Sequence, residues 1–313
     1  MKRNVLRLNV KGAIIAVVFA MINLYAYTTS PYFEKQRTYH DQIESYFDKN
    51  AKILIVGDSH PGVLKNSMLN DVTHNIASGG DGFKESYLKL RYILSQSQAV
   101  EIVFLTSDAQ MFSTRRSQSS NAAFLHKYSL LLNEMDVYQH DHLSVLVQMV
   151  PLFNDSYIDY INKDLQNIIS GDKKKVILDQ SLRGNESLWS TSYTPLQRVK
   201  KAIETGKKDH AGVMEDKALP KYYRKIIILC KEYNIRIIGV RYPAMKEYFE
   251  QLSSQKNLHL EAFLKSLPFE KILDYRNFSQ NPKLYNNEDH LNKDGALQLL
   301  RQMEKDTGLK LKS

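Results

Sequence analysis

The chain has 313 residues, enough to bury a substantial core, either as one domain with insertions or as two domains. Its 43% hydrophobic and 25% charged residues are ordinary for a globular protein, and its single cysteine, Cys230, excludes an internal disulfide. The formal net charge is +9 and comes partly from basic runs. Because these runs contain no recognisable nucleic-acid-binding motif, we expect them to be solvated faces and expect no nucleic-acid partner. Such basic faces would suit an anionic envelope polymer or a membrane surface.

The N-terminal segment has the pattern of a membrane anchor. Residues 1–11 form a basic tail, and residues 12–28 form an apolar run that only Asn23 interrupts. The run is short for a spanning helix, which needs about 20 apolar residues, but Tyr25 and Tyr27 can extend it through the interface. We therefore expect a single transmembrane signal-anchor.

A cleaved signal peptide is the alternative for this segment. Its best small-x-small pair is Leu24 and Ala26, which makes a poor cleavage site, so we favour the uncleaved anchor. The basic flank stays in the cytoplasm, so the rest of the chain is expected outside it, in the periplasm or at the cell surface. Residues 29–50 then form a juxtamembrane linker.

An α/β domain is predicted over residues 51–313. Residues 52–56 carry four branched apolar side chains in a row, a pattern typical of a strand covered on both faces of a parallel sheet. The strand ends in G-D-S-H, where Gly57 permits a sharp turn and residues 63–69 can enter a helix. Catalytic groups collect at the carboxyl ends of parallel strands, and Ser59 stands at such an end; the alternative is a polar turn without chemistry.

Two further polar segments follow predicted strands. The glycine-rich A-S-G-G-D-G of residues 77–82 comes after a short strand, and the T-S-D of residues 106–108 comes after a strand at 101–105. Residues 113–219 are polar and mostly helical by composition, with an apolar patch at residues 145–153. We expect this region to be an insertion packed beside the sheet, as a lid or a partner surface.

The α/β pattern resumes after the insertion. We expect a helix at residues 222–233, a strand at 236–240, a helix at 244–252 and a strand at 271–273. The chain then reaches N-N-E-D-H-L-N-K-D-G-A, a polar loop at residues 286–296 that leads into an apolar-periodic final helix.

The blocks G-D-S-H and E-D-H-L-N-K-D-G-A resemble those of the SGNH (GDSL-like) hydrolase superfamily, and most closely its membrane-anchored, extracytoplasmic acyltransferase or esterase-like branch. The resemblance implies a three-layer, flavodoxin-like parallel sheet, with the nucleophile in the first block and a D-x-x-H dyad in the last. It covers these two short blocks and the strand pattern between them, and most of the insertion lies outside it.

The resemblance implies Ser59 as the nucleophile and His290 as its general base, because a neutral hydroxyl needs a base within hydrogen-bond reach. The family acid stands three residues before the histidine, where this chain has Asn287. Asp289 is the nearest carboxylate and Glu288 the next. We therefore predict Asp289 as the orienting acid, with Asn287 orienting the ring through its side-chain carbonyl as the alternative.

The predicted oxyanion hole departs from the family pattern. In the resembling family a small residue after the second strand lends a backbone N–H, and Gly79 or Gly80 is the matching position; a glycine-rich loop without a ligand is the alternative. The family also has an asparagine where this chain has Asp108, and a carboxylate cannot donate a hydrogen bond unless it is protonated. We expect the hole to rest on backbone groups, and Asp108 to bind a substrate hydroxyl or to cap the next turn.

The other histidines carry weaker signals. We interpret His60 as a turn residue facing solvent, and Asp58 as a residue that holds the turn together. His126 stands alone, and the H-D-H of residues 140–142 lacks a second cluster at ligand spacing. We therefore predict no metal site and no cofactor.

Two functions of different classes fit these features. The first is an O-acyltransferase or esterase that acts on an acyl-carbohydrate or envelope polymer through Ser59 and His290, with a polytopic membrane-bound acyltransferase as a partner. The second is a catalytically inactive module for polysaccharide binding or assembly, which the changed residues at positions 108 and 287 would fit. The fold alone cannot decide between them.

Overall fold

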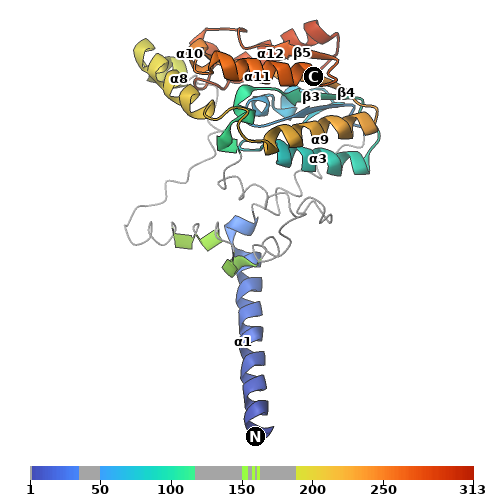
Figure 1. Ribbon diagram of the computed structural model, residues 1–313, viewed down its shortest axis with the longest axis vertical. Coiled ribbons are helices and arrows are strands. Elements are labelled where there is room, and N and C mark those ends of the chain that lie inside the picture. Colours follow the sequence, from blue (N-terminus) through green and yellow to red (C-terminus); the bar gives the residue numbers. More distant parts are fainter. Residues whose placement is uncertain (1, 35–49, 117–149, 154–156, 159–160, 163–187) are drawn as a thin grey trace. The chain divides into compact units, whose positions relative to one another are not determined.

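The computed structural model describes most of the chain as two compact units (Figure 1). One unit contains Met1–Glu44 and Leu132–Leu178, and the other contains Ser45–Leu131 and Asp179–Ser313. Much of the predicted insertion, residues 113–219, lies outside the described residues. The residues that the structure describes are 2–34, 50–116, 150–153, 157–158, 161–162 and 188–313.

The first unit is built on one long helix, α1 (Lys2–Thr29). Its segment Lys11–Thr29 has 19 residues and a mean hydropathy of 1.6, so it is long and apolar enough to cross a membrane. This segment coincides with the predicted anchor at residues 12–28. A signal sequence has the same length and composition, so the orientation and processing of the helix stay predictions.

A short turn from the middle of the chain packs against α1. In this turn, η7 (Pro151–Phe153), the backbone N–H of Leu152 donates to Asn23 Oδ1 at 3.0 Å. The Phe153 ring lies 5.5 Å from that of Phe19 between centroids. Asn23 also donates its amide to the Phe19 carbonyl, so the one polar interruption of the apolar run has hydrogen-bond partners, as burial in an apolar environment requires.

The second unit contains a five-stranded parallel sheet in the order β2-β1-β3-β4-β5. This is the doubly wound order of flavodoxin-like folds, whose ligand crevice lies at the carboxyl ends of the strands where the order reverses, between β1 and β3. The strands are β1 (Ile53–Val56), β2 (Thr73–Asn75), β3 (Ile102–Thr106), β4 (Arg236–Arg241) and β5 (Lys271–Asp274).

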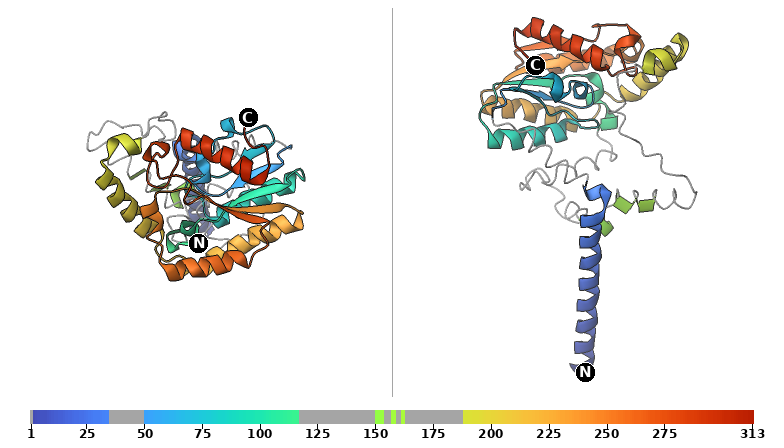
Figure 2. Two further views of the ribbon diagram at one scale, coloured as in Figure 1. Left: turned by 90° about the horizontal axis from the view of Figure 1, so that it is seen from above. Right: turned by 180° about the vertical axis from the view of Figure 1, so that it is seen from behind.

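Helices cover both faces of the sheet, as the left view of Figure 2 shows. One face carries α3 (Phe83–Gln96), α9 (Ala218–Glu232) and α11 (Ser254–Lys265), and the other carries α12 (Lys293–Thr307). Alternate residues of a strand point to opposite faces, so Leu54 joins the first core and Ile55 joins the second. The predicted parallel α/β architecture is therefore confirmed.

Helix ends follow the local sequence. α8 (Pro195–Asp209) begins with a capping box, in which the Thr194 backbone N–H donates to the side chain of Gln197 at 2.9 Å. α12 is capped by the preceding residue, Asn292, whose side chain accepts a hydrogen bond from the Gly295 backbone N–H at 3.0 Å. The remaining described helices are short: α7 (Leu188–Ser192), α10 (Lys246–Phe249), η1 (Pro61–Val63), η2 (Asn66–Met68), η3 (Ala109–Phe112), η4 (Thr114–Arg116) and η9 (Pro282–Leu284).

Two predicted helices differ from the structure. The helix expected at residues 63–69 is wrong, because η1 and η2 are separate single turns. The cause is Asn66, whose side chain accepts a hydrogen bond from the Asn75 backbone at 2.7 Å and so ties this segment to β2. The helix expected at 244–252 is limited to α10.

Candidate active site

Ser59 lies partly exposed on the turn that directly follows β1. Gly57 makes this turn possible, because a Cβ there would collide with the side chains of Thr106, on the neighbouring strand β3, and Pro61. Only glycine lets the end of β1 approach β3 this closely. The first motif is therefore held at the switch point of the sheet.

The glycine-rich loop after β2 lies beside Ser59. A Cβ built on Gly79 would be 3.8 Å from the Ser59 Cβ, and Gly80 has a φ of +84°, in the left-handed region that favours glycine. At the end of the loop, Asp81 forms a buried ion pair with Lys89 of α3 at 2.5 Å. Of the two predicted oxyanion positions, Gly79 is thus placed next to the Ser59 side chain, and Gly80 shapes the loop.

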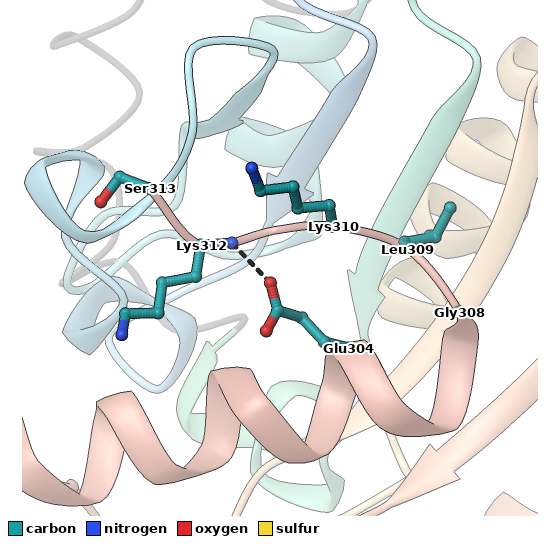
Figure 3. A pocket seen from close by; sticks show the side chains of 6 residues that line it. All are labelled: Glu304, Gly308, Leu309, Lys310, Lys312 and Ser313. Carbon is teal, nitrogen blue, oxygen red and sulfur yellow. Dashed lines mark hydrogen bonds between the residues drawn. The ribbon is translucent and has the colours of Figure 1, made fainter.

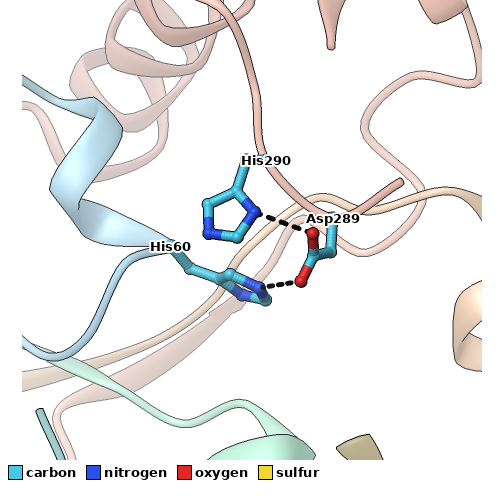
Figure 4. Close-up of side chains that lie close together, drawn as sticks. All are labelled: His60, Asp289 and His290. Carbon is cyan, nitrogen blue, oxygen red and sulfur yellow. Dashed lines mark hydrogen bonds and ion pairs between the residues drawn. The ribbon is translucent and has the colours of Figure 1, made fainter. Parts of the chain in front are cut away.

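His290 lies on the loop before α12, with 24% of its side chain exposed. Its Nδ1 is 2.7 Å from Asp289 Oδ1 and 3.1 Å from Asn287 Oδ1. The same Asn287 oxygen accepts the His290 backbone N–H at 2.8 Å. Both predicted orienting residues therefore face one ring nitrogen, and the other, Nε2, lies on the far side of the ring from the carboxylate (Figure 4).

Glu288 is turned away from this histidine. Its carboxylate accepts a hydrogen bond from the Thr205 hydroxyl of α8, and its backbone carbonyl accepts one from the Met245 N–H at 2.8 Å. Of the two carboxylates near His290 in sequence, Asp289 alone contacts the ring in the described structure.

The first and last motifs meet through a second histidine. The His60 ring lies 5.1 Å from the His290 ring between centroids, at an interplanar angle of 89° (Figure 4). Because Ser59 directly precedes His60, the predicted nucleophile and base lie at the same edge of the sheet. Within the part of the chain that the structure describes, no hydrogen bond joins Ser59 to His290, so their direct contact stays a prediction.

His60 does not face solvent, and that prediction is wrong. The residue is 3% exposed, with Nδ1 at 2.9 Å from Asp108 Oδ2 and Nε2 at 3.3 Å from Asp289 Oδ2. The reason is that three segments converge here. His60 follows β1, and the end of β3 and the final loop each bring a carboxylate to its ring. Neither motif taken alone carries a signal for this arrangement.

Charge pairing dominates the protonation of this group. Burial lowers the pKa of His60, but the hydrogen bonds with Asp108 and Asp289 outweigh it and raise the pKa well above its ordinary value. Burial raises the pKa of Asp289, but the charge and hydrogen bond of His290, together with those of His60, hold it well below the usual range. For Asp108 burial prevails, and its pKa is raised.

Asp58 is fully buried beneath the turn. One oxygen accepts the His60 backbone N–H at 3.1 Å, which confirms that it holds the turn together. The other oxygen is 2.5 Å from Arg116 Nη2 of η4 and 3.3 Å from the Gln110 amide nitrogen. Burial raises the pKa of Asp58, but Arg116 and His60 together lower it below the ordinary value.

Asp108 is buried among protein groups. It is 3% exposed, and its second oxygen accepts the Tyr242 backbone N–H at 2.9 Å. Its side chain makes no capping hydrogen bond to η3, so the capping alternative is wrong. Both oxygens are engaged by protein groups, one by Tyr242 and the other by His60.

The end of α8 brings two further titratable groups to the site. The Tyr248 hydroxyl contacts Asp209 Oδ2 at 3.3 Å and Gln110 Oε1 at 3.0 Å. The adjacent His210 is 4% exposed, and its ring lies 4.8 Å from that of Tyr248. Among the described residues, neither of its ring nitrogens has a hydrogen-bond partner. Burial lowers the pKa of His210 to about 4. His210 stands in no motif from which its place in the site could be predicted.

One side-chain group in the described residues has the composition of a cation site. His60, Asp289 and His290 each place a ligand atom within 4.8 Å of the others. Both ring nitrogens of His60 face carboxylate oxygens, so we interpret the group as a hydrogen-bonded network rather than as a ligand set. His126 and residues 140–142 lie outside the described residues.

A shallow surface hollow at the C-terminal tail is separate from this site (Figure 3). Glu304 of α12 accepts hydrogen bonds there from the backbone N–H groups of Leu311 and Lys312, each at 2.8 Å. These bonds tie the tail to the helix. No residue of the two motifs lines the hollow.

Comparisons with known proteins add no functional assignment. The chain matches no model of a known protein family, and no curated protein matches it. The functional argument therefore depends on the residues that meet at the carboxyl edge of the sheet.

Proposed function

We propose that the chain is a membrane-anchored, extracytoplasmic enzyme of acyl-ester chemistry, an O-acyltransferase or esterase with an SGNH-like active site. The observation that carries the proposal is the Asp289–His290 pair, with 2.7 Å between Oδ1 and Nδ1, held beside the turn of Ser59. A carboxylate on Nδ1 fixes the tautomer that leaves Nε2 basic. That nitrogen is the one that must take a proton from an attacking hydroxyl.

The proposed reaction has two halves. In the first, the Ser59 oxygen attacks the acyl carbon, its proton moves to His290 Nε2, and the leaving alcohol takes that proton as the acyl–oxygen bond breaks. In the second, water or a sugar hydroxyl gives its proton to His290 and attacks the acyl-serine, and Ser59 is regenerated. Water as acceptor makes the chain an esterase, and a sugar hydroxyl makes it a transferase.

Backbone groups are the proposed stabilisers of the oxyanion. Gly79 lies beside Ser59, because a Cβ built on Gly79 would be 3.8 Å from the Ser59 Cβ. The side chain of Asp108, at the family's asparagine position, contacts His60. Preorganised N–H donors aimed at the developing charge contribute a large share of the rate enhancement in acyl transfer. A hole made of backbone groups does not need the family asparagine.

The proposed substrate is an acyl-carbohydrate or envelope polymer. Support comes from the N-terminal helix that is long enough to span a membrane and from the net charge of +9, which suits an anionic surface. A polytopic membrane-bound acyltransferase is the proposed partner that would supply the acyl group.

A serine-directed fluorophosphonate tests this function. The full-length chain should become labelled at Ser59, and Ser59→Ala should abolish the label because the activated hydroxyl is lost. Ser78→Ala, in the neighbouring loop, is the matched control and should keep the label. A wild-type chain that stays unlabelled would favour the second function, an inactive module for polysaccharide binding or assembly.

A further inference from the structure

His60 is engaged at both ring nitrogens by carboxylates from different parts of the chain. Asp108, at the end of β3, lies 2.9 Å from Nδ1, and Asp289, in the final loop, lies 3.3 Å from Nε2. The amide nitrogen of Gln110 is also near the ring, 2.9 Å from Nδ1 and 3.0 Å from Nε2. Because it is almost equally close to both nitrogens, it lies over the face of the ring and not on the in-plane lone pair of either one. A carboxylate without a proton can only accept hydrogen bonds, so a ring nitrogen facing it must donate. An imidazole donates at both positions only when it carries a positive charge.

The surrounding charges favour the same state. The carboxylates of Asp58, Asp108 and Asp289 are all buried around His60, and Arg116 is the cation in contact with one of them, Asp58, at 2.5 Å. Buried carboxylates without compensating cations are strongly disfavoured. A proton on His60 supplies the missing positive charge at the centre of the group.

We infer that His60 is a positioning residue: as a buried imidazolium it joins Asp108 to Asp289 and thereby sets the orientation of His290. The inference deepens the proposed function and rests on it for its catalytic meaning. His60 makes no contact with a reacting atom in this scheme; it acts through Asp289.

The two oxygens of the Asp289 carboxylate have different partners, which explains how His60 can act on His290. Oδ2 is held by His60, and Oδ1 contacts His290 Nδ1 at 2.7 Å. The first contact fixes the carboxylate plane, so the second points at His290 from a rigid support. The His290 ring, 5.1 Å from that of His60 between centroids, is thereby held with Nδ1 on the carboxylate and Nε2 on the opposite side.

Other titratable groups face the same pair and enter any pH profile. Around the two histidines these groups are Asp58 after β1, Asp108 after β3, Arg116 of η4, Asp209 and His210 at the end of α8, Tyr242 after β4, Tyr248 of α10 and Asp289 itself. Among them His60 alone bridges two carboxylates through its two ring nitrogens.

The first experiment reads the protonation of His60 directly. The full-length protein, labelled with ¹⁵N-histidine and held in detergent micelles, would be titrated by NMR from pH 6 to pH 8, a range around the ordinary histidine pKa of about 6.5. Both ring nitrogens of His60 should show the shifts of protonated nitrogen throughout. A His60 ring with one unprotonated nitrogen at neutral pH would overturn the inference. This measurement needs no variant, so it does not depend on whether a substituted chain folds.

The second experiment reads the effect on His290. In His60→Gln, the downfield proton resonance of His290 Nδ1–H should move upfield or be lost by exchange, because Asp289 loses the contact that holds its carboxylate plane. His74→Gln is the matched control, because the His74 ring contacts the Asp71 carbonyl at 3.0 Å, away from this network, and its loss should leave the resonance in place. An unchanged His290 resonance in His60→Gln would contradict the inference.

The two failures can be told apart. If Ser59 labelling depends on an oriented His290, the labelling rate should fall in His60→Gln together with the loss of the His290 Nδ1–H resonance. A chain that shows both NMR results but no labelling in the wild type would retain the hydrogen-bonded network and refute the proposed enzyme. Labelling that falls in His60→Gln while the His290 resonance stays in place would show that His60 has only a structural role.

Discussion

Asp289 and His60 are 229 positions apart in the chain, and a 3.3 Å contact between Oδ2 and Nε2 joins them in the buried centre of the site. The contact connects the loop before the last helix to the turn after the first strand. Because the other Asp289 oxygen holds His290, the orientation of the predicted base depends on a residue that belongs to the nucleophile motif.

The first prediction concerns the orienting acid. Asp289→Asn should lower turnover by about two to four orders of magnitude, because the variant loses the charge that stabilises the His290 imidazolium and can present the wrong tautomer. Asn287→Ala should have a modest effect, since its oxygen lies further from Nδ1, at 3.1 Å against 2.7 Å for Asp289. Steady-state hydrolysis of a chromogenic ester measures both.

The reverse ranking would show that the amide of Asn287 orients the ring despite lacking a charge. Glu288→Gln is the matched control, because this carboxylate is bonded to Thr205 rather than to His290 and its loss should leave turnover within a few-fold of wild type.

The second prediction concerns stability above neutral pH. The folded-state pKa of His60 is raised above its unfolded value of about 6.5, so the folded chain binds a proton that the unfolded chain has released. This contribution is complete below pH 6.5 and is lost as pH rises toward the folded pKa. The free energy of unfolding should therefore fall by about 1.4 kcal/mol per pH unit above pH 6.5.

Chemical denaturation of wild type and His60→Gln at several pH values measures this slope. Subtracting the variant curve removes the contributions of groups away from the site. The prediction would be contradicted if, above pH 6.5, the free energy of unfolding of the wild type fell no more steeply with pH than that of His60→Gln.

The third prediction concerns the acid side and has the opposite sign. The pKa of His210 is lowered to about 4 by burial, so between pH 4 and pH 6.5 the unfolded chain binds a proton that the folded chain does not. Stability should rise with pH over this interval, and His210→Phe should remove about 1.4 kcal/mol per pH unit from that slope. At pH 7 the same variant should be as stable as wild type or more so, because within the described part of the chain neither ring nitrogen of His210 has a partner to lose.

A strong loss of stability in His210→Phe at pH 7, seen by thermal unfolding, would instead show that the His210 nitrogens bind a group of their own. His60→Phe provides the contrast: it leaves buried carboxylates unpaired and should be severely destabilised.

The fold was largely predictable because its strands carry local signals. The apolar run of β1 and the polar residues at its end predicted a buried parallel strand, and the structure has it at Ile53–Val56. The helix expected at residues 63–69 could not be excluded in the same way. There the side chain of Asn66 bonds to the backbone of Asn75, a tertiary contact that overrides local helix preference.

The site was only half predictable for a related reason. Ser59, His290 and Asp289 stand in motifs, so their roles could be proposed from short stretches of sequence. The meaning of His60 depends on Asp108 and Asp289, which are 48 and 229 positions away, and on burial that a polar turn does not signal. Asp108 was expected to face a substrate, but it meets His60 because the ends of β1 and β3 are neighbours in the sheet.

The fourth prediction concerns topology. The basic tail, residues 1–11, should remain in the cytoplasm, so a reporter fused after Ser313 should be active only outside it. Alkaline phosphatase, which needs an oxidising compartment, and a green fluorescent protein that folds in the cytoplasm make a complementary pair of fusions. A fluorescent green fluorescent protein fusion together with an inactive alkaline phosphatase fusion would overturn the extracytoplasmic placement.

The last prediction concerns Ser59 and His290 as a unit. Because one supplies the nucleophile and the other its base, Ser59→Ala and His290→Ala should each abolish hydrolysis or acyl transfer while expression and membrane association remain. The double variant should be hardly slower than either single variant, since residues that act together are not additive. A substrate-bound structure should bring the Ser59 oxygen to about 2.6–3.2 Å from His290 Nε2. Independent losses that multiply in the double variant would mean that the two side chains do separate work, and the proposed Ser–His pair would then be rejected.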